Sequence, residues 1–365
     1  MTRSLRTQIT ISPKRINLPT NKPLSLLIFG AGAIGGYIGG SLLLKGHRVI
    51  FLEREHNAPT LRKQGLRLTI EENTHIFKDI EVATSIENSL SGRPFDLALF
   101  ALKSYDTADA VKSLMSHLDQ LPPFLCLQNG VDNETALAAF LGEKNVIAGT
   151  VTTAIGKPQI GEIVLQRKRG IGLDGNHPLS QRLAKAMQEA DLNPRQYANP
   201  AEMKWSKLLT NLLANASCAI LNMSPSQVLS HPGLFEIEMH QLREAIAVMA
   251  AKNLRVMDLP GTPVRSLAFA AKRLPLGLAR PLLARIAGRG RGDKMPSLHI
   301  DLHNSQKGKS EVSWLNGAVS RWGIDANIRT PVNDKLHDIL VTLISKPSEK
   351  EAFSKRPDAL IKAIG

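Results

Sequence analysis

The chain has 365 residues, of which 43% are hydrophobic, so it is long enough for two domains that each bury a core. No apolar run approaches the length needed to cross a bilayer, so no membrane-spanning segment is expected. The formal net charge is +14, and most of the surplus lies in residues 1–22 and 265–294. No nucleic-acid-binding signature accompanies this charge, so it favours attraction of a phosphorylated cofactor and an anionic substrate, with no nucleic-acid partner.

Two further features bear on the compartment of the protein. Cys126 and Cys218 lie far apart inside apolar segments, so a disulfide framework is not expected and a reducing, cytoplasmic location is. Residues 1–22 lack the apolar core of a secretory signal and are predicted to be a disordered basic tail, with an organelle transit peptide as the alternative.

The most informative stretch is Leu26–Gly40, in which an apolar run meets a glycine-rich turn and then a helical pattern. The turn has the form G-x-G-x-x-G and comprises Gly30, Ala31, Gly32, Ala33, Ile34 and Gly35. The first glycine permits a tight turn, the second lets a pyrophosphate approach the backbone, and the third lets helix and strand pack closely. The helix N-terminus offers N–H groups and partial positive charge, so we expect a dinucleotide-binding turn.

Strand and helix patterns alternate from residue 25 to about residue 173. Strands are expected at Leu26–Phe29, Val49–Leu52, Asp96–Ala101, Phe124–Leu127 and Val146–Thr150. Helices are expected at Ile34–Lys45, Thr107–Leu118 and Asn133–Phe140. This alternation predicts a parallel sheet with helices on both faces, and residues 161–166 and 171–173 are expected to add an antiparallel extension.

The pattern changes at Asn193–Pro200, which contains two prolines and two asparagines. Beyond it, long helical patterns occupy residues 201–221, 233–254 and 311–322. The predicted fold class is therefore α/β, with an N-terminal Rossmann-type dinucleotide-binding domain and a C-terminal all-α domain. We place the first domain at 23–196, the helical substrate domain at 197–345 and a polar tail at 346–365.

Residues at the ends of the expected strands bear on the cofactor. After the second strand, Glu53 favours the ribose hydroxyls of NAD, whereas Arg54 favours the 2′-phosphate of NADP, so these two residues leave the choice open. Lys103 and Asn129 follow later strands, where open α/β sheets bind ligands. Asn129 also precedes a glycine, and Asn-Gly is a common turn.

Lys207, Asn211 and Asn215 recur every four residues in the helical pattern 201–221 and therefore share one face. Such a stripe is either a solvated edge or the polar lining of a closed pocket. A solvated edge usually carries several charges, whereas this stripe has one lysine and two amides. A lysine partly removed from water is suited to give a proton to a developing alkoxide.

Two other features have ordinary and functional interpretations. His299 and His303 are four residues apart, but no third ligand with zinc-site spacing is evident, so no metal is expected. Residues 267–287 mix leucine and alanine with basic residues, as in helices on membrane surfaces. Pro275 and Pro281 interrupt any long helix there, so short helices packed in the protein or at a homodimer interface are favoured, with no membrane partner.

Together these motifs resemble the ketopantoate reductase (2-dehydropantoate 2-reductase) family over roughly residues 26–340. The motifs that carry the resemblance are GAGAIGG at 30–36, the arginine at 54, ALKSYDT at 101–107, LQNG at 127–130, W-x-K-L-x-x-N-x-x-x-N at 205–215, PSLHIDL at 296–302, SEVSWLNGAV at 310–319 and TPVN at 330–333. The resemblance implies reduction of a small-molecule 2-oxo acid, 2-dehydropantoate, to pantoate by NADPH in pantothenate biosynthesis.

The resemblance also assigns roles on the substrate side. Lys207 is similar to the general acid that protonates the ketone oxygen. Asn211 and Asn215 match substrate-binding amides, and Ser297 matches a hydroxyl that contacts substrate. Glu311 resembles a catalytic carboxylate that orients the substrate and the nicotinamide ribose.

On the cofactor side, Asn129 resembles the residue that positions nicotinamide beside the ketone, in contact with cofactor and substrate. Arg54 and Lys103 resemble contacts to the adenosine end, which makes NADPH/NADP+ the expected cofactor. Glu53 departs from the small or apolar residue usual at its position. The alternatives are a paralogous reductase of another 2-oxo acid and a non-catalytic NAD(P)-binding regulator, whose basic segments would recruit a macromolecule.

Overall fold

The computed structural model describes residues 8–10, 22–277, 279–280, 295–303 and 308–365. Its contacts divide the chain into two compact units. Unit 1 runs to Gln128 and adds Asn133–Pro200 and Pro260–Thr262, whereas unit 2 comprises Asn129–Asp132, Ala201–Leu259 and the chain from Pro263 on. The chain thus changes unit at residues 129, 133, 260 and 263 as well as after residue 200. Apart from residues 8–10 and 22, the predicted basic tail lies outside the described residues, as do residues 278 and 281–294 of the basic segment 265–294.

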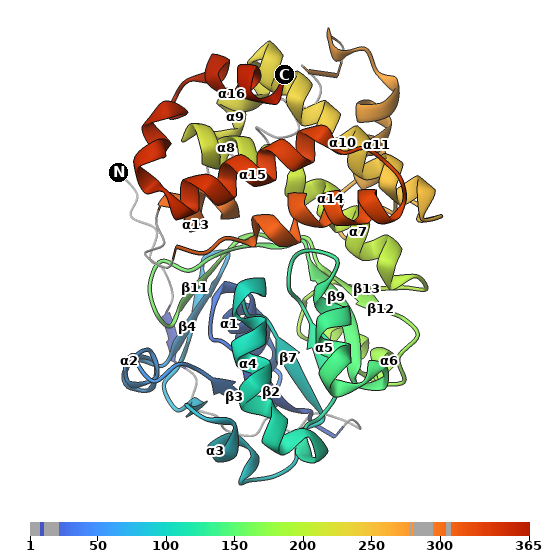
Figure 1. Ribbon diagram of the computed structural model, residues 1–365. Helices are drawn as coiled ribbons and strands as arrows, with labels where there is room; N and C mark the ends of the chain where they lie inside the picture. The colour runs from blue at the N-terminus through green and yellow to red at the C-terminus, as the bar shows by residue number, and fades with distance from the viewer. Residues whose placement is uncertain (1–7, 11–21, 278, 281–294, 304–307) are drawn as a thin grey trace. The chain divides into compact units, whose positions relative to one another are not determined.

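Unit 1 is built on an eight-stranded sheet of Rossmann type, with the strand order β13-β12-β9-β8-β7-β2-β3-β6 (Figure 1). The strands are β2 (Ser25–Phe29), β3 (Arg48–Leu52), β6 (Glu81–Ala83), β7 (Leu97–Phe100), β8 (Phe124–Cys126), β9 (Val146–Val151), β12 (Ile171–Asp174) and β13 (Pro194–Tyr197). From β6 through β9 all neighbours are parallel, and Ile28 on β2 lies opposite Phe51 and Leu99. The predicted parallel sheet is confirmed.

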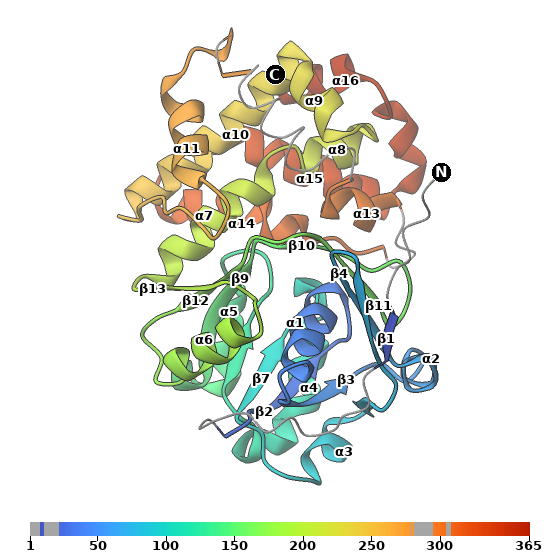
Figure 2. The same cartoon turned by 180° about the vertical axis from the view of Figure 1, so that it is seen from behind.

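Helices cover both faces of this sheet, α4 and α5 on one (Figure 1) and α1 and α6 on the other (Figure 2). The helices are α1 (Ala33–Leu43), α2 (Ala58–Gln64), α3 (Ile86–Leu90), α4 (Thr107–Leu114), α5 (Asn133–Leu141) and α6 (Ser180–Glu189). Successive side chains of a strand point to opposite faces, so Ile28 packs in the core under α1 and Phe29 in the core under α4.

A second, five-stranded sheet of unit 1 has the order β1-β5-β4-β11-β10 and was not predicted. Its strands are β1 (Gln8–Thr10), β4 (Leu66–Ile70), β5 (Asn73–Phe77), β10 (Ala154–Gly156) and β11 (Glu162–Arg167). The prediction that 161–166 would extend the main sheet was therefore wrong, because β11 pairs with β4 and β10. By contrast, β12 does pair antiparallel with β9, and residues 194–197 of the expected boundary form β13.

Unit 2 is all-helical among its described residues, as predicted. Its helices are α7 (Pro200–Leu212), α8 (Ala216–Leu221), α9 (Pro225–Ser230), α10 (Pro232–Ala251), α11 (Val264–Arg273), α13 (Ser297–His303), α14 (Asn316–Asp325), α15 (Pro331–Ser345) and α16 (Pro357–Ile364), with the 3-10 helices η4 (Glu311–Trp314) and η5 (Pro347–Ala352). The segment 346–365, expected as a polar tail, contains η5 and α16, and its Leu360 is fully buried. Within the described ranges, no helix has the length and apolar character needed to span a membrane.

The single helix predicted over 201–221 is in fact two helices. The first, α7, ends at Leu212, and Ala214 has a φ of +51°, outside the helical region. Asn215 then serves as the N-cap residue of α8. The buried carboxylate of Glu238 on α10 stabilises the break, because it accepts hydrogen bonds from the Ala214 N–H at 2.6 Å and from the Ser217 hydroxyl at 2.5 Å.

Candidate active site

The three glycines of the turn after β2 have conformations and surroundings that fit a dinucleotide-binding turn. Gly30 has a φ of +88°, which side-chain-bearing residues rarely adopt. A Cβ on Gly32 would have no atom within 4 Å, so the backbone there is open to a ligand. A Cβ on Gly35 would lie 2.1 Å from the Gly30 carbonyl oxygen, so only glycine lets α1 pack this closely. The turn therefore fits a pyrophosphate.

The other residues of the turn present backbone rather than side chains. Gly32 is the N-cap residue of α1 and has no side chain to cap the helix, and no acid occupies the first turn. Ala33 and Ile34 are the first two helical residues, so their N–H groups belong to the helix end that attracts anions. The N–H of Ala31, in contrast, donates to Glu53 Oε2 at 2.9 Å.

The end of β3 carries a compact set of charged groups. The Glu53 carboxylate accepts the Ala31 N–H at Oε2. At Oε1 it also accepts hydrogen bonds from the Arg54 N–H at 2.9 Å and from Asn57 Nδ2 at 3.2 Å. The guanidinium of Arg54 forms an ion pair with Asp106, with Nη2 and Oδ2 2.7 Å apart. Lys103 precedes the 3-10 helix η1 (Ser104–Asp106) as its N-cap residue, so it lies at the other end of the same short turn as Asp106.

In unit 2, the loop Asn129–Asp132 is held to the helices at both ends. Asn211 Nδ2 on α7 donates to Asn129 Oδ1 at 3.1 Å. Asp132 accepts hydrogen bonds from Arg321 Nη2 at 2.5 Å and from the Trp322 indole N–H at 2.6 Å, both on α14. Asn129 is therefore fixed relative to α7 rather than left in a free turn.

Lys207 and Asn211 are one helical turn apart on α7, and both side chains are half-buried. Asn215 is only 4% exposed, and its amide is fully engaged. Its Nδ2 donates to the Asn211 carbonyl at 2.8 Å and lies 3.4 Å from Ser297 Oγ, and its Oδ1 accepts from the Leu298 N–H at 3.1 Å. Asn215 thus anchors the start of α13, which carries Ser297.

Glu311 lies in η4 and is 1% exposed. Its backbone N–H donates to Asp301 Oδ2 on α13 at 3.4 Å, and the hydroxyl of Ser310 caps η4 by accepting from the Val312 N–H. The structure therefore links Glu311 to the helix that carries Ser297. It joins Asn129, Asn211, Asn215 and Ser297 by hydrogen bonds, whereas the glycine turn, Arg54 and Lys103 belong to unit 1.

Two histidines fix α13 against α8, which lie side by side in Figures 1 and 2. His299 Nε2 lies 2.8 Å from Asn222 Oδ1, His303 Nε2 donates to the Ala219 carbonyl at 2.8 Å, and the two rings stack with centroids 4.3 Å apart. Burial, and next the charge of His303, lower the pKa of His299 to about 4. The described part of the chain contains no group of three or more His, Cys, Asp or Glu arranged for a metal ion.

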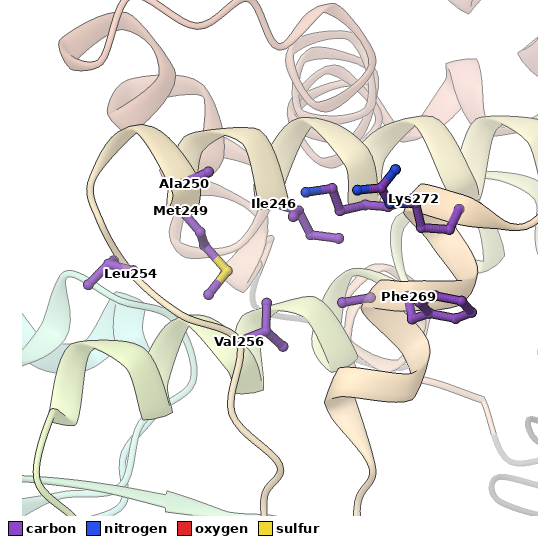
Figure 3. Close-up of a pocket in the computed structure, with 9 residues that line it drawn as sticks. Ile246, Met249, Ala250, Leu254, Val256, Phe269 and Lys272 are labelled. Carbon is purple, nitrogen blue, oxygen red and sulfur yellow. The ribbon is translucent and has the colours of Figure 1, made fainter.

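A hollow of about 280 Å³ lies elsewhere in unit 2, at α10 and α11 (Figure 3). Seven of the nine residues that line it are apolar, with Ile246, Met249 and Phe269 among them, and the other two are Lys272 and Arg273. None of the predicted site residues lines it.

Three residues that the sequence did not single out contact or position predicted site residues or the helices that carry them. They are Asp132, which holds the Asn129 loop, Asp106, which pairs with Arg54, and Glu238, which shapes the α7–α8 break. Glu238 could have been found as an acid within the apolar pattern of 233–254. The other two had no local signal, because their partners are 190 and 52 residues away in the chain.

A glycine turn that fits a dinucleotide, on a Rossmann-type sheet, and a helical unit that carries a lysine and amides on one helix are together the arrangement expected of a nicotinamide-dependent oxidoreductase. The sequence profile described as "Ketopantoate reductase PanE/ApbA" matches residues 26–174, and that of its C-terminal part matches residues 199–343. The chain belongs to the ketopantoate reductase family.

Individual relatives agree with this assignment. The chain is 27% identical to a 2-dehydropantoate 2-reductase of Pyrococcus horikoshii over 315 residues, which cover 85% of this chain and 94% of the relative. A crystal structure of a PanE/ApbA family ketopantoate reductase from Ralstonia eutropha has a TM-score of 0.74 at 25% identity, covering 89% of this chain and all of that one. D-Mandelate dehydrogenase, solved with NADH and anilino(oxo)acetate, shares the fold with a TM-score of 0.73 at 19% identity, covering 90% of this chain and 99% of that one.

Proposed function

We propose that the protein reduces a 2-oxo acid with a nicotinamide dinucleotide, and that 2-dehydropantoate, converted to pantoate for pantothenate biosynthesis, is its substrate. One observation carries the proposal: a half-buried lysine stands one helical turn from Asn211, whose amide is hydrogen-bonded to Asn129. The glycine turn adds a fit to the dinucleotide. The family resemblance favours NADPH as the cofactor, and the relative from Pyrococcus horikoshii bears the name of this reaction.

Proton and hydride reach the ketone from different groups. A nicotinamide dinucleotide, which the glycine turn at Gly30–Gly35 fits, would supply the hydride equivalent for the reduction. Lys207, as an ammonium group, donates a proton to the carbonyl oxygen while negative charge develops there, which is general acid catalysis. A cation near that oxygen also stabilises the developing alkoxide before the proton is transferred.

The remaining residues bind and orient the substrate. A 2-oxo acid presents a ketone and a carboxylate, which accept hydrogen bonds, so amide and hydroxyl donors such as Asn129, Asn211 and Ser297 suit it. Asn215 acts through Ser297, which it contacts. Glu311 is a hydrogen-bond acceptor rather than a donor. We assign its carboxylate the role of accepting hydrogen bonds from hydroxyl groups of the substrate and the nicotinamide ribose.

The test is a screen of purified protein against several 2-oxo acids with NADPH and with NADH. Oxidation of the reduced nicotinamide is measured by the loss of its absorbance. We expect turnover with 2-dehydropantoate, and a loss of about 100- to 10,000-fold in kcat for Lys207→Ala. Dinucleotide affinity, measured by fluorescence titration, should change little in this variant. Lys335→Ala is the matched control, because Lys335 is an exposed lysine on α15 of the same unit.

Two outcomes would overturn parts of the proposal. Reduction of other 2-oxo acids with no activity on 2-dehydropantoate would replace the substrate but keep the reaction class. Tight dinucleotide binding without turnover of any 2-oxo acid would instead favour a non-catalytic regulator.

A further inference from the structure

The ribose next to adenine is where NADPH and NADH differ, since NADPH carries a phosphate in place of the 2′-hydroxyl. In Rossmann domains the residues after the second parallel strand meet this group. In this chain that strand is β3, and Glu53 and Arg54 follow it directly. The acid favours a cofactor with a 2′-hydroxyl, whereas the arginine favours one with a 2′-phosphate. The contacts of the two side chains therefore bear on which cofactor is preferred.

The carboxylate of Glu53 is held against the glycine turn. Its Oε2 accepts from the Ala31 N–H at 2.9 Å, and its Oε1 accepts from the Arg54 N–H and Asn57 Nδ2. These bonds keep the negative charge beside the loop that receives the dinucleotide. Each carboxylate oxygen has two lone pairs, so Oε2 can still accept a hydrogen bond from a ribose hydroxyl. A phosphate dianion has no proton to donate and would be repelled there.

The guanidinium of Arg54 forms an ion pair with an acid of the same unit, Asp106. Its Nη2 is 2.7 Å from Asp106 Oδ2, and the Asp106 side chain is only 14% exposed, against 44% for Arg54. A 2′-phosphate would have to compete with this carboxylate for the guanidinium. Lys103 and Arg54 supply two positive charges at these loops, and Glu53 and Asp106 supply two negative ones, so the set offers no net positive charge to a phosphate.

We propose that the adenosine-ribose subsite selects a 2′-hydroxyl, so that the protein prefers NADH to NADPH, with Glu53 as the discriminating residue. Asp106 is a positioning residue that acts through Arg54 by holding its guanidinium. The inference rests on the proposed function in one respect only, that the ligand of the glycine turn is a nicotinamide dinucleotide. It departs from the cofactor that the family resemblance implies.

The test compares binding and does not depend on turnover. Full-length protein is titrated calorimetrically with NADH and NADPH, and then with AMP and adenosine 2′,5′-bisphosphate, which differ only by the 2′-phosphate. We expect NADH to bind about tenfold or more tightly than NADPH, because one charge repulsion in a partly buried site is worth at least that factor. The two adenosine fragments should show the same order.

Variants separate the two acids. Glu53→Gln keeps an oxygen for the Ala31 N–H and removes the charge, so it should tighten NADPH binding about tenfold or more and change NADH binding less. Asp106→Asn should tighten NADPH binding by a smaller factor. Glu55→Gln is the matched control, since it makes the same charge change at an exposed acid two residues along the chain.

The outcomes are distinct. Tighter binding of NADPH by the wild type, or an unchanged NADH to NADPH ratio in Glu53→Gln, overturns this inference alone. If neither dinucleotide binds, both the inference and the proposed function fall. If the expected ratios hold but no 2-oxo acid is reduced, the inference stands and the proposed function falls.

Discussion

The side-chain amide of Asn211 donates a hydrogen bond to the side-chain oxygen of Asn129 across 3.1 Å, although the two residues are 82 positions apart in the chain. This bond ties a loop that follows a strand of the Rossmann sheet to the helix that carries Lys207. Each amide therefore orients the other. Residues that act as a unit lose their function together when either is removed.

We accordingly predict that Asn129→Ala and Asn211→Ala have effects that do not add. Each single variant should lower kcat/KM about 10- to 100-fold, because each removes one of the proposed substrate contacts and releases its hydrogen-bond partner. The double variant should be little worse than the more damaging single variant. Steady-state kinetics on the four proteins of this cycle gives the coupling. Strictly additive losses would show that the two amides act independently.

The bonds of Asp132 to α14 should contribute to the stability of unit 2. Asp132→Ala leaves the Trp322 indole N–H without its acceptor, so the free energy of unfolding should fall by about 1–3 kcal/mol. Asp132→Asn retains an oxygen and should lose less, since the Arg321 partner is half-exposed and its ion pair contributes little. Urea unfolding followed by tryptophan fluorescence reports this unit, because Trp205, Trp314 and Trp322 all lie in it.

The control for this measurement is Asp79→Ala, which removes an exposed acid of unit 1. Equal unfolding curves for Asp132→Ala and this control would contradict the anchoring role of Asp132.

Gly32→Ala and Gly35→Ala should have different effects, the first mainly on dinucleotide affinity and the second mainly on the free energy of unfolding. At Gly35 the new Cβ would meet the Gly30 carbonyl oxygen at 2.1 Å, so we expect a loss of about 3 kcal/mol or more in unfolding free energy. At Gly32 the Cβ enters open space, so stability should change by less than about 1 kcal/mol. Dinucleotide affinity should nonetheless fall about tenfold or more in Gly32→Ala, because the methyl group occupies the approach of the pyrophosphate.

Circular dichroism melts and calorimetric titration measure the two effects in parallel. Unimpaired dinucleotide binding by a folded Gly32→Ala protein would show that the ligand does not approach this backbone.

His299 should make the stability of the protein depend on pH. Its pKa is about 4 in the folded protein, below the ordinary value of 6.5, so the unfolded chain binds the proton more readily between these values. The contribution of the neutral His299 ring to the free energy of unfolding is therefore complete above pH 6.5 and is lost as the pH falls toward 4. Over this window we expect the wild type to lose about 2 kcal/mol more stability than His299→Gln. His56→Gln, at an exposed histidine, should follow the wild type.

Urea unfolding at half-unit steps of pH would test this prediction. Parallel curves for the wild type and His299→Gln would mean that protonation of this ring does not oppose folding.

The central sheet was predictable because its parallel strands are buried on both faces and read as continuous apolar runs. The second sheet was not, since strands such as Asn73–Phe77 are only half-buried and mix polar with apolar residues. Its strands β4 and β5 form a hairpin, but β4 completes its other side with β11, far along the chain. Local patterns cannot indicate such pairing.

The candidate site shows the same division. Motifs and spacing identified Lys207, Asn211 and the glycine turn from local sequence. The break after Leu212 could not be predicted, because Leu212, Leu213 and Ala214 are good helix formers and the carboxylate that stabilises the break, Glu238, lies on another helix. The resemblance named Asn215, but its contacts with α13 became visible only in the structure.

The membership of Asn129–Asp132 in the helical unit has a consequence for anyone who wishes to express the two halves separately. A gene fragment that starts at Ala201 would encode the lysine helix without the carboxamide that Asn211 binds and without the acid that Trp322 binds. Such a fragment would show defects that belong to the missing tetrapeptide. Supplying that peptide in trans, or grafting it through a linker, is the appropriate way to dissect this enzyme by halves.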